Sequence, residues 1–94
     1  MSDLSTLWAQ HRDADYPRMH GPNAGEFMTL DTVICGCVTH YLDSGHDLDP
    51  QRMEMLRDCL NDLNNLMPEL NEAASAYFAR LHHMATLLMD VYRH

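Results

Sequence analysis

Cysteine and histidine are the side chains of this sequence best suited to metal or redox chemistry, and the chain has three cysteines and seven histidines. Cys35 and Cys37 are two residues apart, so on a helix their side chains point about 200° apart and cannot share a ligand. Cys37 and His40 share a helical face, but a metal site needs two more ligands. The other candidates are distant in sequence: His46, His82 and His83. We therefore predict no metal site and expect the cysteines to fill space in the core.

Sequence motifs of the common catalytic sites are absent from the chain. It has no Gly-x-Ser-x-Gly turn, no glycine-rich phosphate loop and no His-Glu-x-x-His pair. The spacing from Glu69 or Glu72 to the His82-His83 pair also differs from the Glu-x-x-His motif of di-iron bundles. We therefore predict a protein that is not an enzyme and has no cofactor. A pocket with a histidine in hydrogen-bond reach of a carboxylate would point to an enzyme instead.

The N-terminal segment carries a candidate interaction patch. Trp8, Arg12 and Tyr16 recur at intervals of four, which predicts one helical face with a guanidinium between two aromatic rings. His20 follows in the next loop. Tryptophan, tyrosine and arginine are frequent in the residues that dominate protein interfaces. The alternative is that Trp8 and Tyr16 pack the N-terminal arm onto the rest of the domain, because a small domain needs its large side chains for its core.

Apolar residues recur at helical spacing along most of the chain, which predicts an all-α fold. The Asp49-Pro50 pair is a typical helix start. Asn23 and Glu26 are suited to cap the start of the helix predicted at about 26–44. A Pro/Gly-containing loop lies before that helix, at about 17–25. We expect a small three- to four-helix bundle. Its predicted helices span about 2–14, 26–44, 50–65 and 68–92.

Pro68 leaves the last helical segment open to two interpretations. The apolar seam from Met53 to Val91 keeps its phase across Pro68, as it would in one kinked helix of about 42 residues. Such a rod would be about 60 Å long and would need a second chain to cover its seam. Alternatively, Pro68 breaks the helix and the two halves form a hairpin in a compact bundle, which is the interpretation we favour.

Gly36 is a glycine in the middle of a predicted helix, where it costs up to about 1 kcal/mol relative to alanine. It shares a face, away from the main apolar stripe, with Thr32, Thr39, His40 and Asp43. A glycine at this position would let another backbone approach closely. The N-terminal arm or a second chain would be the approaching segment.

Acidic residues outnumber basic residues fourteen to six, and the formal net charge is −8. Such a chain repels phosphate backbones and anionic lipids, so we predict neither a nucleic acid nor a membrane as partner. The N-terminus lacks a basic region followed by an apolar run, and no apolar stretch reaches the roughly 20 residues that span a bilayer. Together with an odd number of cysteines, these features predict a cytoplasmic protein with free thiols.

Wide apolar stripes, an acidic surface and the absence of catalytic motifs together predict a non-enzymatic protein–protein interaction or regulatory module. We expect residues 1–94 to form a single domain that makes a homodimer and binds an unidentified protein partner. The alternative is a helical bundle that binds a small ligand or a metal through histidine and cysteine side chains.

Overall fold

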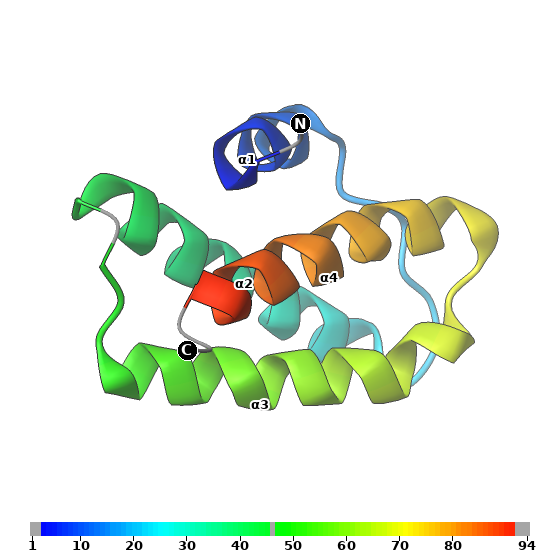
Figure 1. Ribbon diagram of the computed structural model, residues 1–94. Helices are drawn as coiled ribbons and strands as arrows, with labels where there is room; N and C mark the ends of the chain where they lie inside the picture. Colours follow the sequence, from blue (N-terminus) through cyan, green and yellow to red (C-terminus); the bar gives the residue numbers. More distant parts are fainter. Residues whose placement is uncertain (1–2, 46, 92–94) are drawn as a thin grey trace.

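The chain folds into a small bundle of four α-helices in the computed structural model, which describes residues 3–45 and 47–91 (Figure 1). No strand occurs among these residues. The elements are α1 (Leu4–Asp13), α2 (Ala24–Asp43), α3 (Pro50–Leu66), the short 3-10 helix η1 (Met67–Glu69) and α4 (Glu72–Val91). The prediction of a small all-α bundle is confirmed.

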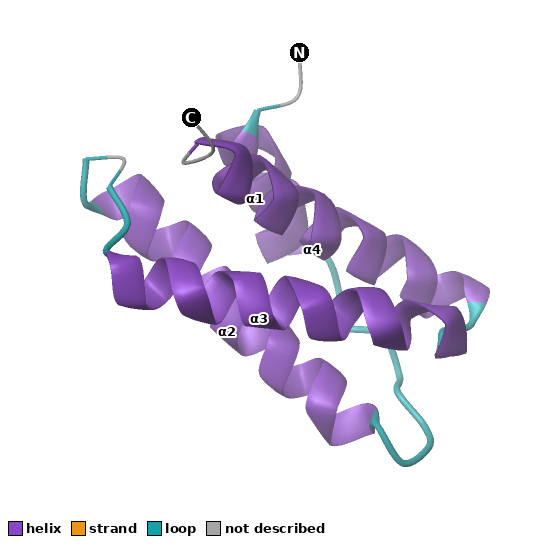
Figure 2. Ribbon diagram, turned by 60° about the horizontal axis from the view of Figure 1, so that its bottom comes forward, coloured by secondary structure: helices purple, strands orange, loops and turns teal. Residues whose placement is uncertain are grey.

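Helix α4 is the central element of the bundle. It packs against α1, α2 and α3, and Figure 1 shows it crossing above α3, with α1 on its other side. Helices α2 and α3 cross each other (Figure 2). Because three neighbours surround α4, it contributes the largest share of buried side chains: Ala74, Tyr77, Phe78, Leu81, Met84, Ala85 and Leu88.

Three of the helices begin at a polar side chain that caps the free backbone N–H groups of the first turn. Asp3 accepts from the Thr6 N–H at 2.8 Å. Asp49 accepts from the Arg52 N–H at 3.3 Å, with Pro50 directly after it as predicted. Asn71 Oδ1 accepts from the Ala74 N–H at 2.9 Å. These caps fix the starts of α1, α3 and α4.

Helix α2 begins differently from the prediction. It starts at Ala24, two residues before the predicted start, and Asn23 makes no side-chain cap bond there. The Asn23 amide instead donates to Glu69 Oε1 at 2.8 Å, so the expected capping pair of Asn23 with Glu26 is wrong. A contact with the distant α3–α4 connection has replaced the local cap.

Pro68 breaks the helix, and the chain doubles back after it (Figure 1). It lies in η1, and Leu70 is extended, with φ −80° and ψ 142°. The predicted start of the last helix at residue 68 is therefore wrong, because capping by Asn71 allows α4 to begin only at Glu72. The Cα trace measures 37 × 24 × 19 Å, which excludes the long rod.

The ends of two predicted helices fall partly outside the described residues. The predicted start at residue 2 and the predicted end at residue 92 both do so. Helix α1 ends at Asp13 and α2 at Asp43, each one residue before the prediction, and α3 ends one residue after it. Differences of this size are ordinary at helix ends, where hydrogen bonding weakens. None of the described helices is both long enough and apolar enough to cross a membrane.

Leu81 provides a test of the packing around α4. Its side chain is 0% exposed, so Leu81→Ala is expected to lower the free energy of unfolding by about 2–5 kcal/mol through lost contacts and a residual cavity. Urea denaturation measures this. Val91→Ala is the control, because Val91 lies on the same helix and is 44% exposed. Equal losses in the two variants would contradict the core described above.

Candidate functional site

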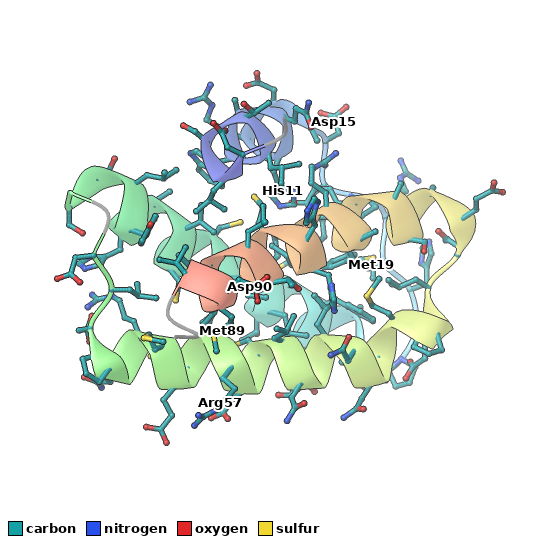
Figure 3. The ribbon with its side chains drawn as sticks, viewed as in Figure 1. His11, Asp15, Met19, Arg57, Met89 and Asp90 are labelled. Atoms are coloured by element: carbon teal, nitrogen blue, oxygen red, sulfur yellow. The ribbon has the colours of Figure 1, made fainter. Side chains whose placement is uncertain are left out.

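A buried histidine joins three helices at the centre of the molecule. His11 projects from α1 and is 3% exposed, and Figure 3 shows it between α1 and α4. Its Nε2 lies 2.9 Å from Asp31 Oδ1 on α2. Arg80 Nε on α4 donates to its Nδ1 at 3.1 Å. Among residues 3–45 and 47–91, His11 is the one acid, base, amide or histidine that is buried.

These two hydrogen bonds fix the tautomer of His11. Arg80 can only donate, so Nδ1 must carry the lone pair. The proton of the neutral ring therefore sits on Nε2 and is donated to Asp31. A neutral imidazole thus connects a guanidinium on one side with a carboxylate on the other, and no buried side-chain nitrogen or oxygen of the described residues lacks a hydrogen-bond partner.

Asp31 accepts hydrogen bonds from two more donors, one on α4 and one on its own helix α2. The Tyr77 hydroxyl donates to Oδ2 at 3.0 Å, and the Cys35 thiol donates to Oδ1 at 3.5 Å. Burial, together with the nearby Asp31 charge, raises the pKa of Tyr77 above its usual value. The same two causes raise the pKa of Cys35 to about 12. Both groups are therefore protonated donors at neutral pH.

The His11 cluster, which comprises His11, Asp31, Cys35, Tyr77 and Arg80, meets half of the condition for an enzyme stated above. A histidine and a carboxylate lie within hydrogen-bond reach, but both ring nitrogens are occupied. Neither His11 nor Asp31 lines the cavities of about 610, 110 and 360 Å³ that lie among the described residues. The cluster therefore presents no free ring nitrogen to a substrate, and the absence of enzymatic activity stays a prediction.

Three members of the cluster also form the one group of potential metal ligands in the described part of the chain. His11, Asp31 and Cys35 each place a ligand atom within 4.8 Å of the others. Sequence spacing did not reveal this group, because His11 lies 20 positions from Asp31. The available signal was Asp31 itself, an acid whose helical-face neighbours Phe27, Ile34 and Cys35 are buried or half-buried.

The metal ligands considered from sequence do not come together in the described residues. Cys37 is buried and donates to the Arg52 carbonyl at 3.8 Å, which agrees with a space-filling role. His82 Nε2 is 2.6 Å from Asn64 Oδ1, which ties α4 to α3. His40 lines the same cavity between α2 and α3 as Cys37, but no third potential ligand joins this pair among the described residues. The remaining candidates are exposed or outside the described residues: His83 and His46, respectively.

The predicted N-terminal patch does not form one helical face. Helix α1 ends at Asp13, so Tyr16 lies beyond the helix that carries Trp8 and Arg12. Arg12 is 61% exposed and faces Asp13, with 3.5 Å between Nε and Oδ1. The expectation that Arg12 stacks between two rings is therefore wrong. Because α1 ends at Asp13, the ring of Tyr16 does not lie on the same helical face as Arg12.

Aromatic packing accounts for the rings of that segment. The ring of Tyr16 contacts Tyr77 and Phe78 edge-on, with centroids 5.4 and 6.1 Å apart, and the Trp8 ring lies 6.4 Å from His11. His20 is separate from these rings and lines a small cavity of about 110 Å³ near the α3–α4 connection. The geometry agrees with the alternative in which Trp8 and Tyr16 attach the N-terminal arm.

An open groove of about 610 Å³ lies between α2 and α3. The α2–α3 groove contains the face that sequence analysis grouped around Gly36. A Cβ placed on Gly36 would meet nothing within 4 Å, so the expected approach of the N-terminal arm to Gly36 is wrong. The arm packs on α4 instead. The lining residues are Thr32, Val33, Gly36, Cys37, Thr39, His40, Asp43, Ser44, Gln51, Arg52 and Met55.

Charge and polarity in this groove differ from the rest of the chain. Its lining has one acid, Asp43, and one base, Arg52, whereas the whole chain has a net charge of −8. Met55 in its lining is 43% exposed, and Met28, which lies outside the lining and eight residues before Gly36 on α2, is 57% exposed. The groove is thus a near-neutral surface with adaptable apolar edges.

Comparisons with known proteins do not assign this chain to a family. No family model, no curated protein and no solved structure matches it. The sites described above are therefore the basis for a functional proposal.

The hydrogen bonds of His11 can be tested by removal. His11→Leu strips Asp31 and Arg80 of a shared partner, so the free energy of unfolding is expected to fall by about 1–3 kcal/mol. Tyr77→Phe, which deletes one donor to Asp31, is expected to cost about 1–2 kcal/mol. Chemical denaturation measures both. His83→Leu, an exposed histidine on α4, is expected to change stability by less than about 0.5 kcal/mol. A His11→Leu variant as stable as the control would contradict the role of the cluster.

Proposed function

We propose that this domain is a non-enzymatic helical protein–protein interaction module that self-associates, with the α2–α3 groove as its binding surface. The observation that carries the proposal is the open, near-neutral groove over Gly36 on an otherwise acidic chain. A cytoplasmic location fits this proposal, because the three cysteines are free thiols.

Gly36 supports the proposal because a glycine in this position lowers the stability of the helix that contains it. A glycine in the middle of a 20-residue helix lowers helix stability by about 1 kcal/mol relative to alanine. None of the described residues requires a glycine here, because none has an atom within 4 Å of a Cβ placed on Gly36. A partner helix that packs closely over this position would gain from it, since small residues let two helix backbones approach.

Two polar side chains next to Gly36 already have hydrogen-bond partners within α2, which lowers the desolvation cost of covering them. Thr32 Oγ1 donates to the Met28 carbonyl at 2.9 Å, and Thr39 Oγ1 donates to the Cys35 carbonyl at 3.0 Å. Each threonine hydroxyl thus uses its proton within α2. A partner that excludes water here leaves neither hydroxyl proton without an acceptor.

Self-association has a direct test in size-exclusion chromatography with light scattering. We expect the mass to rise from monomer to dimer as the concentration increases through the micromolar range. Added salt is expected to strengthen the dimer, because it screens the repulsion between two chains of charge −8. A monomeric mass at every concentration, in both low and high salt, would refute self-association.

A second candidate function is metal binding by His11, Asp31 and Cys35, favoured by the convergence of their ligand atoms within 4.8 Å. Two features oppose it. The ion would have to displace the Nε2 proton and the Cys35 thiol proton, and burial raises the pKa of that thiol to about 12. The tautomer that binds a metal through Nε2 also carries a proton on Nδ1, which faces the Arg80 donor.

Cobalt titration separates this second candidate from the first. If the cluster binds a divalent ion, Co²⁺ should give a thiolate charge-transfer band that disappears in Cys35→Ser and persists in Cys59→Ser. Cys59 is the matched control, because it is a half-buried free cysteine on α3 away from the cluster. No band in the wild-type protein, or equal loss of the band in both variants, would exclude this metal site.

A further inference from the structure

The α2–α3 groove is open and has a volume of about 610 Å³, and we propose that it receives helix α2 of a second copy of this chain. The two α2 helices would run antiparallel and cross at Gly36, on a two-fold axis. This inference rests on the proposed self-association and names its surface and geometry.

The exposed ridge of α2 defines the crossing point. Thr29, Gly36 and Asp43 are seven residues apart in sequence, so they lie along nearly one line of the helix, and all three are exposed. Gly36 is at the centre of this ridge and has no side chain. In a two-fold pair the same residue of each copy meets at the axis, so both helices would present their glycine at the closest approach.

Charge favours the antiparallel orientation. Pairing around Gly36 places Thr29 opposite the partner's Asp43. The two Asp43 carboxylates are then about fourteen residues apart along the pair, roughly 21 Å. That distance exceeds the Debye length of about 8 Å at physiological salt. A parallel pair would instead place the two Asp43 residues side by side, and antiparallel helix dipoles also attract.

Charge also argues against a second copy on the outer face of α3. Glu54, Asp58 and Asp62 are exposed there at intervals of four, so two copies meeting at that face would oppose six carboxylates. The groove lining has one acid and one base. Two acidic chains therefore meet with less repulsion over the groove than at the outer face of α3, and Met55 in the groove lining supplies an adaptable apolar contact.

Gly36→Leu tests the crossing point. No atom lies within 4 Å of a Cβ at this position, and leucine is the better helix former, so the monomer should melt at an equal or higher temperature by circular dichroism. At the crossing of two helices the same side chain would force them apart, so the dimer dissociation constant should rise on the order of tenfold or more. Gly25→Leu is the matched control, because Gly25 is also a helical glycine of α2 with no neighbour within 4 Å.

Thr29→Arg tests the orientation. It places a guanidinium opposite the partner's Asp43 twice in each dimer, so the dissociation constant should fall roughly twofold to tenfold. The double variant Thr29→Arg with Asp43→Arg should lose this gain and bind more weakly than the wild-type protein. Analytical ultracentrifugation at low salt measures all the variants.

The outcomes separate the two proposals. A wild-type protein that stays monomeric refutes the proposed self-association itself. A wild-type dimer that Gly36→Leu leaves as tight as Gly25→Leu keeps self-association and overturns the groove as its surface. Weakening of the dimer by Thr29→Arg overturns the antiparallel orientation. If Gly36→Leu were to unfold, Gly36→Ala with the two arginine variants would decide between the same results.

Discussion

The burial of one face of α4 against three other helices is the constraint on which the remaining structure depends. In a chain of 94 residues the core is small, and α4 can bury its wide apolar face only if α1, α2 and α3 all pack against it. The break at Pro68 follows from the same requirement. The break lets α3 and α4 lie beside each other. The apolar residues of the two helices, which form one continuous seam in the sequence, can then pack together instead of lying along a single rod.

Helix α1 is held differently from the other helices. It is ten residues long and buries two side chains, Leu7 and His11. Apolar burial is therefore limited, and hydrogen bonding through His11 to α2 and α4 provides specificity in addition. Buried polar groups define a unique arrangement only if every member is satisfied. In this cluster each nitrogen of the imidazole has one partner with the complementary role.

Where α1 and α3 leave α2 uncovered, the same architecture produces the α2–α3 groove. The N-terminal arm packs on α4, and α2 and α3 cross each other (Figure 2). A cavity lined by Gly36 lies between them, unfilled by the described residues. Its lining has one acid and one base, so another acidic molecule meets less repulsion there than at the acidic outer face of α3. Internal packing and surface charge together thus distinguish one face of the domain.

Sequence by itself indicated the helices and favoured the break at Pro68, because helical periodicity, proline geometry and the cap at Asp49 act over a few residues. Only the tertiary structure decided the partners of His11 and Asp31, whose contacts join residues 20, 46 and 69 positions apart. It also decided that Tyr16 packs on α4 and that Gly36 faces open space. Such features depend on how helices cross, and crossing is set by the combined packing of all four helices, which local spacing does not encode.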